Sequence, residues 1–201
     1  MDRDGLDALL ITGEENFQYF VGTTATVALH YSLTRPSAFI LPLESDPIVI
    51  TQSRSSVEPG SFVEDYREYA DLYRFPVELA AEALYDAGAA NGRVGVELGL
   101  EQRMGIPVGS YLDLTQTMSD TGFVDGSELI VWMRMVKSDE EQQYMYRAAE
   151  VTARARQRLF GMVKPTMTER EVARLMRQLI LEEGGDRAAF VVLQLDRPGD
   201  K

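Results

Sequence analysis

The stretch WMRMVKSDEEQQYMYRAAEV, residues 132–151, restricts the possible fold more than any other part of the chain. Ser138 is followed three residues later by Glu141, which is the spacing of a capping box. In this motif the serine oxygen accepts a hydrogen bond from a backbone N–H of the first turn, and the glutamate accepts one from the serine N–H. Residues 139–141 are all acidic, as the positive end of a helix dipole favours. We therefore expect a long helix to begin directly after Ser138.

The residues after Ser138 continue with helical periodicity. A first apolar stripe consists of Met145, Ala148, Ala149, Thr152, Ala155 and Leu159. Thr168 and Glu171 repeat the capping-box spacing, and a second apolar face follows, made of Val172, Leu175, Met176, Leu179 and Ile180. A strand is expected at 188–195. Two helices and one strand without a partner cannot cover these faces by themselves, so we expect residues 134–201 to be an incomplete domain.

The residues before the capping box instead show short apolar runs bounded by turn residues. Strands are expected at 6–12, 37–42, 46–52, 62–66, 93–98 and 122–127. Helices are expected at 75–92, 108–118 and 128–135, with Pro76 in the first helical position. On the helix at 128–135, we expect Leu129, Trp132 and Met133 on the buried side. This order of elements predicts an α/β domain over residues 1–133, with a mixed β-sheet and flanking helices.

Composition excludes several classes of protein. The chain has 20 basic and 32 acidic residues, and its formal net charge of −12 would repel nucleic-acid phosphates and anionic membrane surfaces. Cysteine is absent, which removes disulfides, thiol nucleophiles and thiolate metal sites. The sequence has no signal-peptide pattern and no apolar run long enough to span a membrane. We expect a cytoplasmic protein that binds neither nucleic acid nor membranes.

Standard catalytic motifs are also absent: the sequence has no HExxH, GxxxxGK[ST], GxGxxG or GxSxG. We accordingly assign no catalytic residue and no metal ligand within the chain. Two residues are candidates for substrate binding. Arg35, directly before Pro36, has a planar guanidinium suited to a substrate carboxylate, and its alternative role is a solvated charge at a strand end. His30, the single histidine, is the second candidate, and its alternative role is a hydrogen-bonded or partly buried loop histidine.

Four stretches, in order along the chain, form a larger pattern. GLDALLITGEENFQYFVG contains Asn16, Tyr19 and Gly22 in an Asn-x-x-Tyr-x-x-Gly arrangement, and RVGVEL is a later strand with a glutamate at its end. The junction has an Arg-x-x-Lys-Ser motif and an acidic pair, formed by Arg134, Lys137, Ser138, Glu140 and Glu141. VKPTMTEREVARLM supplies the start of a further helix. Together these stretches resemble the creatinase/prolidase family, whose catalytic domain has the pita-bread fold.

The resemblance implies both a fold and an activity. Residues 1–133 would be the family's N-terminal domain, and residues 134–201 the linker, first helices and strand of a truncated α+β pita-bread domain. The family's peptidases bind two divalent metal ions (Mn, Co or Zn) through two aspartates, a histidine and two glutamates, and a metal-bound hydroxide attacks the peptide carbonyl. All those ligands would follow residue 201. The family also usually has a helix before the first strand, where this chain has only MDRDG. We expect a fragment trimmed at both ends.

Three functions remain open. The first is a fragment of a metallopeptidase that hydrolyses Xaa-Pro peptide bonds, a homodimer whose N-terminal domain serves dimerisation and substrate access. The second is a metal-free creatinase-like amidinohydrolase, or another non-peptidase of this fold, acting on a small carboxylated substrate. For this branch the resemblance implies that Arg35 contacts the substrate carboxylate in the active site of the partner subunit. The third is a stand-alone, non-catalytic dimerisation or binding module.

Overall fold

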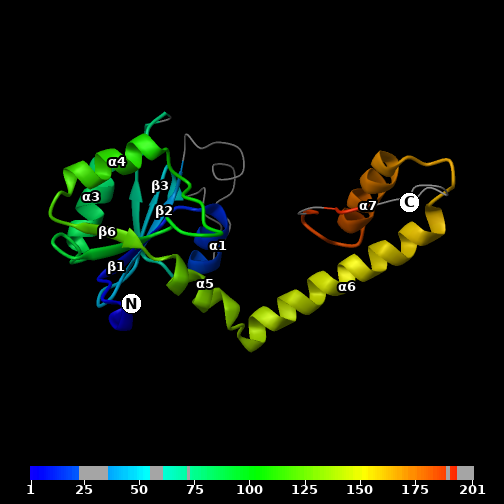
Figure 1. Ribbon diagram of the computed structural model, residues 1–201, viewed down its shortest axis with the longest axis horizontal. Coiled ribbons are helices and arrows are strands. Elements are labelled where there is room, and N and C mark those ends of the chain that lie inside the picture. Colours follow the sequence, from blue (N-terminus) through cyan, green and yellow to red (C-terminus); the bar gives the residue numbers. More distant parts are fainter. Residues whose placement is uncertain (23–35, 55–60, 72, 189–190, 194–201) are drawn as a thin grey trace. The chain divides into compact units, whose positions relative to one another are not determined.

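The computed structural model describes residues 1–22, 36–54, 61–71, 73–188 and 191–193. The chain divides into two compact units, Met1–Met135 and Val136–Lys201 (Figure 1). The two expected substrate-binding residues, His30 and Arg35, lie outside the described residues.

The first unit is built on a β-sheet. Within the described residues the sheet has six strands: β1 (Ala8–Ile11), β2 (Ala38–Pro42), β3 (Ile48–Thr51), β4 (Asp65–Glu68), β5 (Arg93–Val96) and β6 (Gly122–Asp125). Their order across the sheet is β4-β3-β2-β1-β5-β6. Strand β2 is antiparallel to β1 and β3, whereas the pairs β1–β5, β5–β6 and β3–β4 are parallel. The prediction of a mixed sheet is therefore confirmed.

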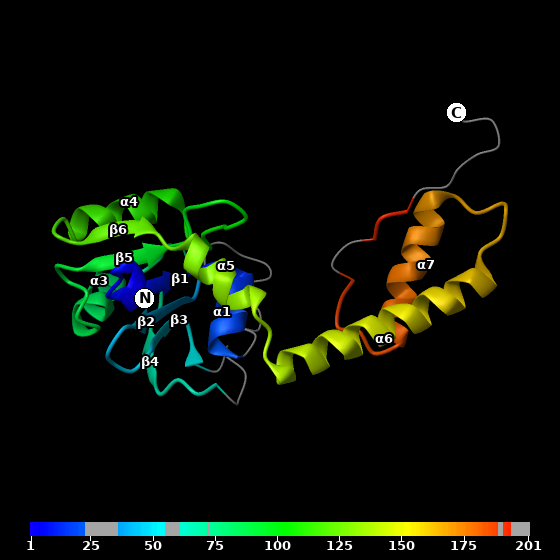
Figure 2. The ribbon, with the colours of Figure 1, turned by 60° about the horizontal axis from the view of Figure 1, so that its bottom comes forward.

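Helices cover both faces of this sheet (Figure 2). They are α1 (Glu14–Val21), α3 (Val77–Asp86), α4 (Val108–Thr117) and α5 (Ser127–Met135), with a short 3-10 helix at Asp2–Asp4. Strand β1 alternates between two cores: Leu10 packs in the cluster that includes Leu84 of α3, and Leu9 in the cluster that includes Phe17 of α1 and Ile130 of α5. Because β1 is buried on both faces, its sequence is continuously apolar rather than alternating.

Two details of the helices differ from expectation. Helix α3 begins at Val77, so Pro76 is its N-cap residue and not its first helical residue. On α5 the side chain of Trp132 is 62% exposed, and the fully buried residue is Ile130. The expectation that Trp132 faces the core is therefore wrong, whereas Leu129 is partly buried against the core.

The orientation of α5 follows from a close approach at its start. A Cβ atom on Gly126 would lie 3.1 Å from the Cα atom of Gly95 in the neighbouring strand β5. The absence of a side chain at both positions lets the backbone of the β6–α5 turn lie against the sheet. Ile130 donates its backbone N–H to the Gly126 carbonyl one turn earlier, and its side chain is turned into the core.

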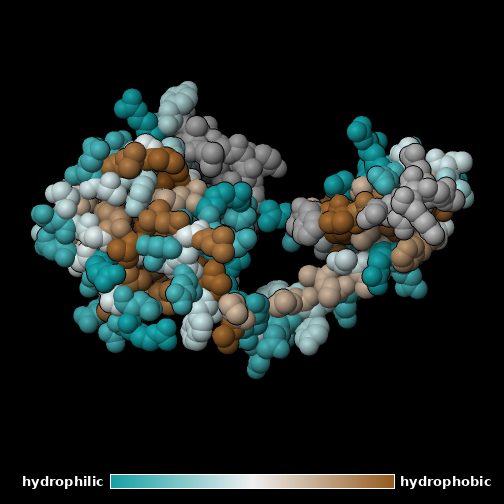
Figure 3. All heavy atoms as spheres, viewed as in Figure 1, coloured by the Kyte–Doolittle hydropathy of each residue, from teal (hydrophilic) through white to brown (hydrophobic). Residues whose placement is uncertain are grey.

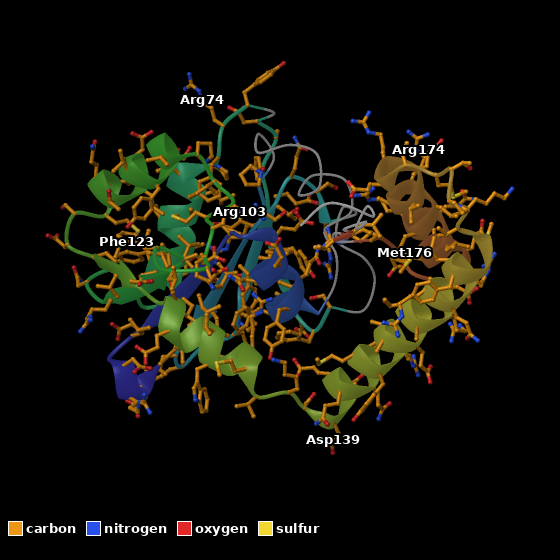
Figure 4. All side chains as sticks on the ribbon, turned by 45° about the vertical axis from the view of Figure 1, so that its right-hand side comes forward. Arg74, Arg103, Phe123, Asp139, Arg174 and Met176 are labelled. Carbon is orange, nitrogen blue, oxygen red and sulfur yellow. The ribbon has the colours of Figure 1, made fainter. Side chains whose placement is uncertain are left out.

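The second unit contains two helices within its described residues, α6 (Asp139–Met162) and α7 (Glu169–Glu182). Both expected capping boxes are confirmed. The Ser138 N–H donates to Glu141 Oε2 at 2.6 Å, and the Glu141 N–H donates to Ser138 Oγ at 3.2 Å. The corresponding distances between Thr168 and Glu171 are 2.8 Å and 3.3 Å. Figure 4 labels Asp139 in the first turn of α6.

The core of the second unit is small. It consists of Ala155, Leu159, Val172, Leu179 and Ile180, with further residues such as Leu175 and Met176 packed against it. The expected apolar face of α7 is confirmed, and Arg174 lies on the exposed side of that helix (Figure 4). On α6, residues 142–150 are all exposed, including Tyr144, Met145 and Tyr146. Apolar side chains are visible on the surface of this unit in Figure 3.

One further expectation for the second unit needs correction. Of the strand expected at 188–195, residues 188 and 191–193 are described and have no strand structure, and the others lie outside the described residues. A strand needs a neighbour to accept its hydrogen bonds, and the described part of this unit offers none. At the end of α7, Glu182 and Glu183 form ion pairs with Arg158 of α6, and Glu183 also pairs with Arg154.

Candidate functional site

Glu97, directly after β5, organises a buried polar cluster of the first unit. Because β1 and β5 are parallel neighbours, the residues that follow both strands lie at one edge of the sheet. The Glu97 side chain is buried, and its Oε2 atom accepts from the N–H groups of Thr12 and Gly13, both at 2.8 Å. The Thr12 hydroxyl donates to the same oxygen at 3.2 Å. A buried carboxylate requires such donors, since an unpaired one would cost several kcal/mol.

Glycine residues allow this cluster to close. A Cβ atom on Gly13 would lie 2.7 Å from Glu97 Oε1 and 2.4 Å from the Arg103 carbonyl oxygen. A Cβ atom on Gly105 would lie 1.9 Å from the Thr12 carbonyl oxygen. Side chains at these two positions would push the 97–105 loop away from the end of β1.

Asn16, in the first turns of α1, extends the cluster from Glu97. Its Nδ2 atom donates to Glu97 Oε1 at 2.6 Å and to Gln102 Oε1 at 2.7 Å. Its Oδ1 atom accepts from Nη1 of Arg134 at 2.6 Å. A single amide therefore joins the 97–105 loop, helix α1 and the last turn of α5.

Tyr19, one turn after Asn16 on α1, makes a second connection to α5. Its hydroxyl donates to the Met133 carbonyl at 3.2 Å, and the guanidinium carbon of Arg134 lies 5.9 Å from the centre of its ring. Gly22 ends the helix in the left-handed region (φ 72°) and donates its N–H to the Gln18 carbonyl. The Asn-x-x-Tyr-x-x-Gly spacing thus has a structural explanation: residues three apart share one helix face, and the glycine stops the helix.

A shallow depression of about 390 Å³ adjoins the cluster. It is lined by Glu15, Asn16, Glu101, Gln102, Arg103 and Arg134. Arg103, labelled in Figure 4, forms an ion pair with Glu15 at 3.0 Å. Among the described non-glycine residues, Glu101 alone has a positive φ, 59°. Arg103 pairs with Glu15, and Arg134 with the Asn16 amide. Because the contacts of Glu97 and Asn16 join separate elements of the fold, we assign the cluster a structural role.

Asp125, at the end of β6, supports the start of α5 beside this cluster. Its carboxylate accepts from the hydroxyl of Ser127 at 2.5 Å and from the Ser127 N–H at 3.0 Å. These hydrogen bonds from Ser127, with others from the backbone of Leu98 and Gly99, hold the pKa of Asp125 below its ordinary value. The Ser127 hydroxyl in turn accepts from the Gly99 N–H at 2.8 Å.

The described residues do not fit a divalent-metal centre of the kind that the resemblance implies. Within the ranges given above, no group of three or more His, Cys, Asp or Glu side chains is arranged to hold a metal ion. We therefore derive no chemical step through a metal from these residues. In the same part of the chain, no helix has both the length and the apolar composition needed to cross a membrane.

Part of this cluster is predictable from the sequence. The quoted motif residues Asn16, Tyr19 and Arg134 come from distant parts of the chain, and the structure brings them together. The sequence marks Glu97 as a glutamate at a strand end but does not indicate its central position, and no motif singles out Thr12 or Gln102. The available signal was a carboxylate placed directly after the apolar strand RVGV, where burial demands hydrogen-bond partners.

Known proteins resemble the chain over nearly all its length. It is 23% identical over 190 residues to a Xaa-Pro dipeptidase of Pyrococcus horikoshii, covering 94% of this chain and 48% of the relative. It is 22% identical over an alignment of 212 residues to the ectoine hydrolase of Halomonas elongata, covering 95% and 51%. A solved Xaa-Pro dipeptidase structure from Bacillus anthracis superposes with a TM-score of 0.74 at 19% identity, covering 94% and 48%. The chain spans about half the length of the curated relatives it matches.

A match to a family model covers most of the chain. Residues 1–136 match the model of the Creatinase/Prolidase N-terminal domain. The matched range includes Asn16, Tyr19, Glu97 and Arg134, the residues that the fold brings together after β1 and β5. The resemblance inferred from the sequence motifs is thereby confirmed, and the chain belongs to the creatinase/prolidase N-terminal domain family.

Proposed function

We propose that the chain is part of a hydrolase that cleaves Xaa-Pro peptide bonds. The observation that carries this proposal is the family match over residues 1–136, joined to a likeness that continues beyond the first unit. That likeness covers 94% of the chain in the comparison with the Xaa-Pro dipeptidase of Pyrococcus horikoshii. A protein that shared only the N-terminal domain would not be expected to extend the similarity into α6 and α7.

Within this proposal the two parts of the chain have different roles. Residues 1–133 form an N-terminal domain that serves dimerisation and substrate access, and residues 134–201 form the linker and first elements of a catalytic domain. The small core of the second unit and the exposed residues 142–150 support the second assignment, because a complete domain covers its apolar faces.

In this proposal, the reactive groups of the hydrolase lie outside the described residues. Two divalent ions (Mn, Co or Zn) would be held by side chains outside the described residues, which contain no suitable group of donors. Arg35 and His30 would contact a peptide or small carboxylated substrate, in a cytoplasmic homodimer.

A turnover assay tests the proposal. The native polypeptide is purified, its intact mass is compared with the 22.5 kDa of residues 1–201, and it is assayed with Mn or Co on a Xaa-Pro dipeptide. We expect a larger native mass and turnover by the native protein, but no turnover by the 201-residue chain. Rapid hydrolysis by residues 1–201 alone would contradict the assignment of the reactive groups, and inactivity of a larger native protein on Xaa-Pro dipeptides would contradict the substrate class.

The role of Arg35 has its own test. In the native protein, Arg35→Ala should raise KM for a substrate with a free carboxylate, because a guanidinium–carboxylate pair is lost. Arg74→Ala is a matched control, since Arg74 is an exposed arginine of the same unit (Figure 4). If Arg35→Ala and Arg74→Ala have equal kinetic constants, Arg35 does not bind the substrate carboxylate.

A second candidate function is hydrolysis of a small non-peptide substrate. The similarity to the Halomonas ectoine hydrolase, over 95% of this chain, favours it. The same assay with ectoine in place of the dipeptide separates the two candidates. A stand-alone binding module remains the third, and it predicts a native mass of 22.5 kDa with no turnover of either compound.

A further inference from the structure

Helix α5 ends where the first unit ends, and its last turn is held by side chains of helix α1. The boundary between the two units follows Met135, the last residue of α5. Two hydrogen bonds join this turn to α1: Asn16 accepts from Arg134, and Tyr19 donates to the Met133 carbonyl. The carbonyl groups of a last helical turn have no partner within the helix, so a donor such as the Tyr19 hydroxyl stabilises that turn.

The orientation of the Asn16 amide is determined by Glu97. The two N–H groups of an asparagine amide can each donate once, and those of Asn16 face two acceptors, Glu97 Oε1 and Gln102 Oε1. The amide oxygen must then point to the opposite side, where it meets the Arg134 guanidinium at 2.6 Å. A flipped amide would place its oxygen against the buried carboxylate and its N–H groups against a cation.

Glu97 itself cannot turn to accommodate another arrangement. Its second oxygen is fixed by the backbone N–H groups of Thr12 and Gly13, which belong to the chain at the end of the central strand β1. Rigid backbone donors therefore fix the carboxylate, the carboxylate fixes the amide, and the amide fixes the arginine.

We propose that Glu97, Asn16 and Arg134 form a latch that holds the last turn of α5 and thereby protects the connector that follows it, residues 136–138, from local unfolding. Glu97 and Asn16 are positioning residues in this device, because they act through Arg134. The latch goes beyond the proposed hydrolase function and does not depend on it, since all its contacts lie within the first unit.

Limited proteolysis of the 201-residue chain tests the latch. Trypsin cleaves after lysine, and the Lys137–Ser138 bond lies in the connector in every variant. Asn16→Ala disconnects Arg134 while leaving Glu97 its three donors from Thr12 and Gly13. We expect cleavage at Lys137–Ser138 to accelerate at least about tenfold, equivalent to about 1.4 kcal/mol of lost local protection.

Arg134→Gln provides a second variant that leaves the buried part of the cluster intact, and Arg74→Gln is the matched control. The rotational freedom of Trp132, the only tryptophan and a residue of α5, is followed by fluorescence anisotropy. Faster cleavage and a more mobile Trp132 in Arg134→Gln, with the thermal midpoint of the first unit unchanged, support the latch. Partial recovery in Arg134→Lys would support it further, because lysine keeps the charge but loses the planar fork.

The result that overturns the latch is equally definite. If Arg134→Gln is cleaved at Lys137–Ser138 no faster than Arg74→Gln, the connector is not controlled by Arg134, whatever the behaviour of Asn16→Ala. Faster cleavage that accompanies a lowered thermal midpoint in both variants would likewise assign these residues to general stability and not to the connector.

Discussion

The two units of this chain differ in how completely they bury their apolar residues. In the first, β1 and β2 are covered on both faces, so that Leu9, Leu10 and Phe39 are almost fully inaccessible. In the second, helix α6 has 24 residues but only Ala155 and Leu159 are buried. Both units have well-formed secondary structure, because capping boxes and helix propensity act locally. The comparison shows that local signals specify helices even where tertiary packing is sparse.

The largest effect is expected for a core substitution in the first unit. Phe39→Ala should lower its free energy of unfolding by about 3–5 kcal/mol, because it removes a fully buried aromatic ring and leaves a cavity. Urea unfolding followed by Trp132 fluorescence reports this unit. Leu100→Ala, at a residue 86% exposed, is the control and should change little. A loss below about 1 kcal/mol for Phe39→Ala would contradict the two-sided packing of the sheet.

An intermediate effect is expected for the corresponding change in the second unit. Leu179→Ala should destabilise the α6–α7 hairpin by about 2–3 kcal/mol, near the low end for leucine, because the small core can relax around the cavity. The helical circular dichroism signal should melt earlier while the Trp132 transition stays in place. Leu181→Ala, at an exposed neighbouring position, is the matched control. A parallel shift of the Trp132 transition would show that the two units unfold as one.

The smallest effect is expected from acid. Hydrogen bonds from Arg158 and Arg154 hold the pKa of Glu183 below its ordinary value. A lowered folded-state pKa gives stability that is present above the ordinary pKa and is lost as pH falls through the lowered one. The α6–α7 hairpin should therefore lose a little stability below about pH 4, and the loss is small because exposed ion pairs contribute little. At high salt the loss should be smaller still, because salt screens these pairs. In Glu183→Gln, the melting temperature of the hairpin should fall less as the pH is lowered below about 4. If it falls as much as in the unaltered chain, other carboxylates cause the pH dependence.

Much of the fold could be predicted because its signals are local or periodic. Five strands of the first unit lie within short apolar runs, whereas β4 overlaps its expected range 62–66 only in part and the range 188–195 shows no strand in its described residues. Both long helices follow from serine or threonine three residues before glutamate. The α7 face was predictable because an amphipathic helix repeats its apolar residues over several turns. On the short helix α5, by contrast, the pattern indicated a buried face that includes Trp132, and Trp132 is exposed. The Gly126–Gly95 approach, which selects the face of Ile130, depends on neighbours distant in sequence.

The polar cluster was only partly predictable for a related reason. Motif spacing identified Asn16, Tyr19 and Arg134 as a pattern, but not as one another's neighbours. Their meeting point depends on β1 pairing with β5, which the sequence does not specify without the strand order. Asn16 and Arg134 are 118 positions apart, and only the folded sheet brings them to 2.6 Å.

The parallel pairing of β1 with β5 also has a consequence for biosynthesis. The strands β1, β2 and β3 can associate as soon as they emerge from the ribosome, but one side of β1 then has no neighbour until residues 93–96 have been made. At roughly 5–20 residues per second, the ~40 residues between β3 and β5 take several seconds to translate. During that interval the nascent chain presents an open edge of apolar strand, which is a site for chaperone capture or for misassembly with another nascent chain.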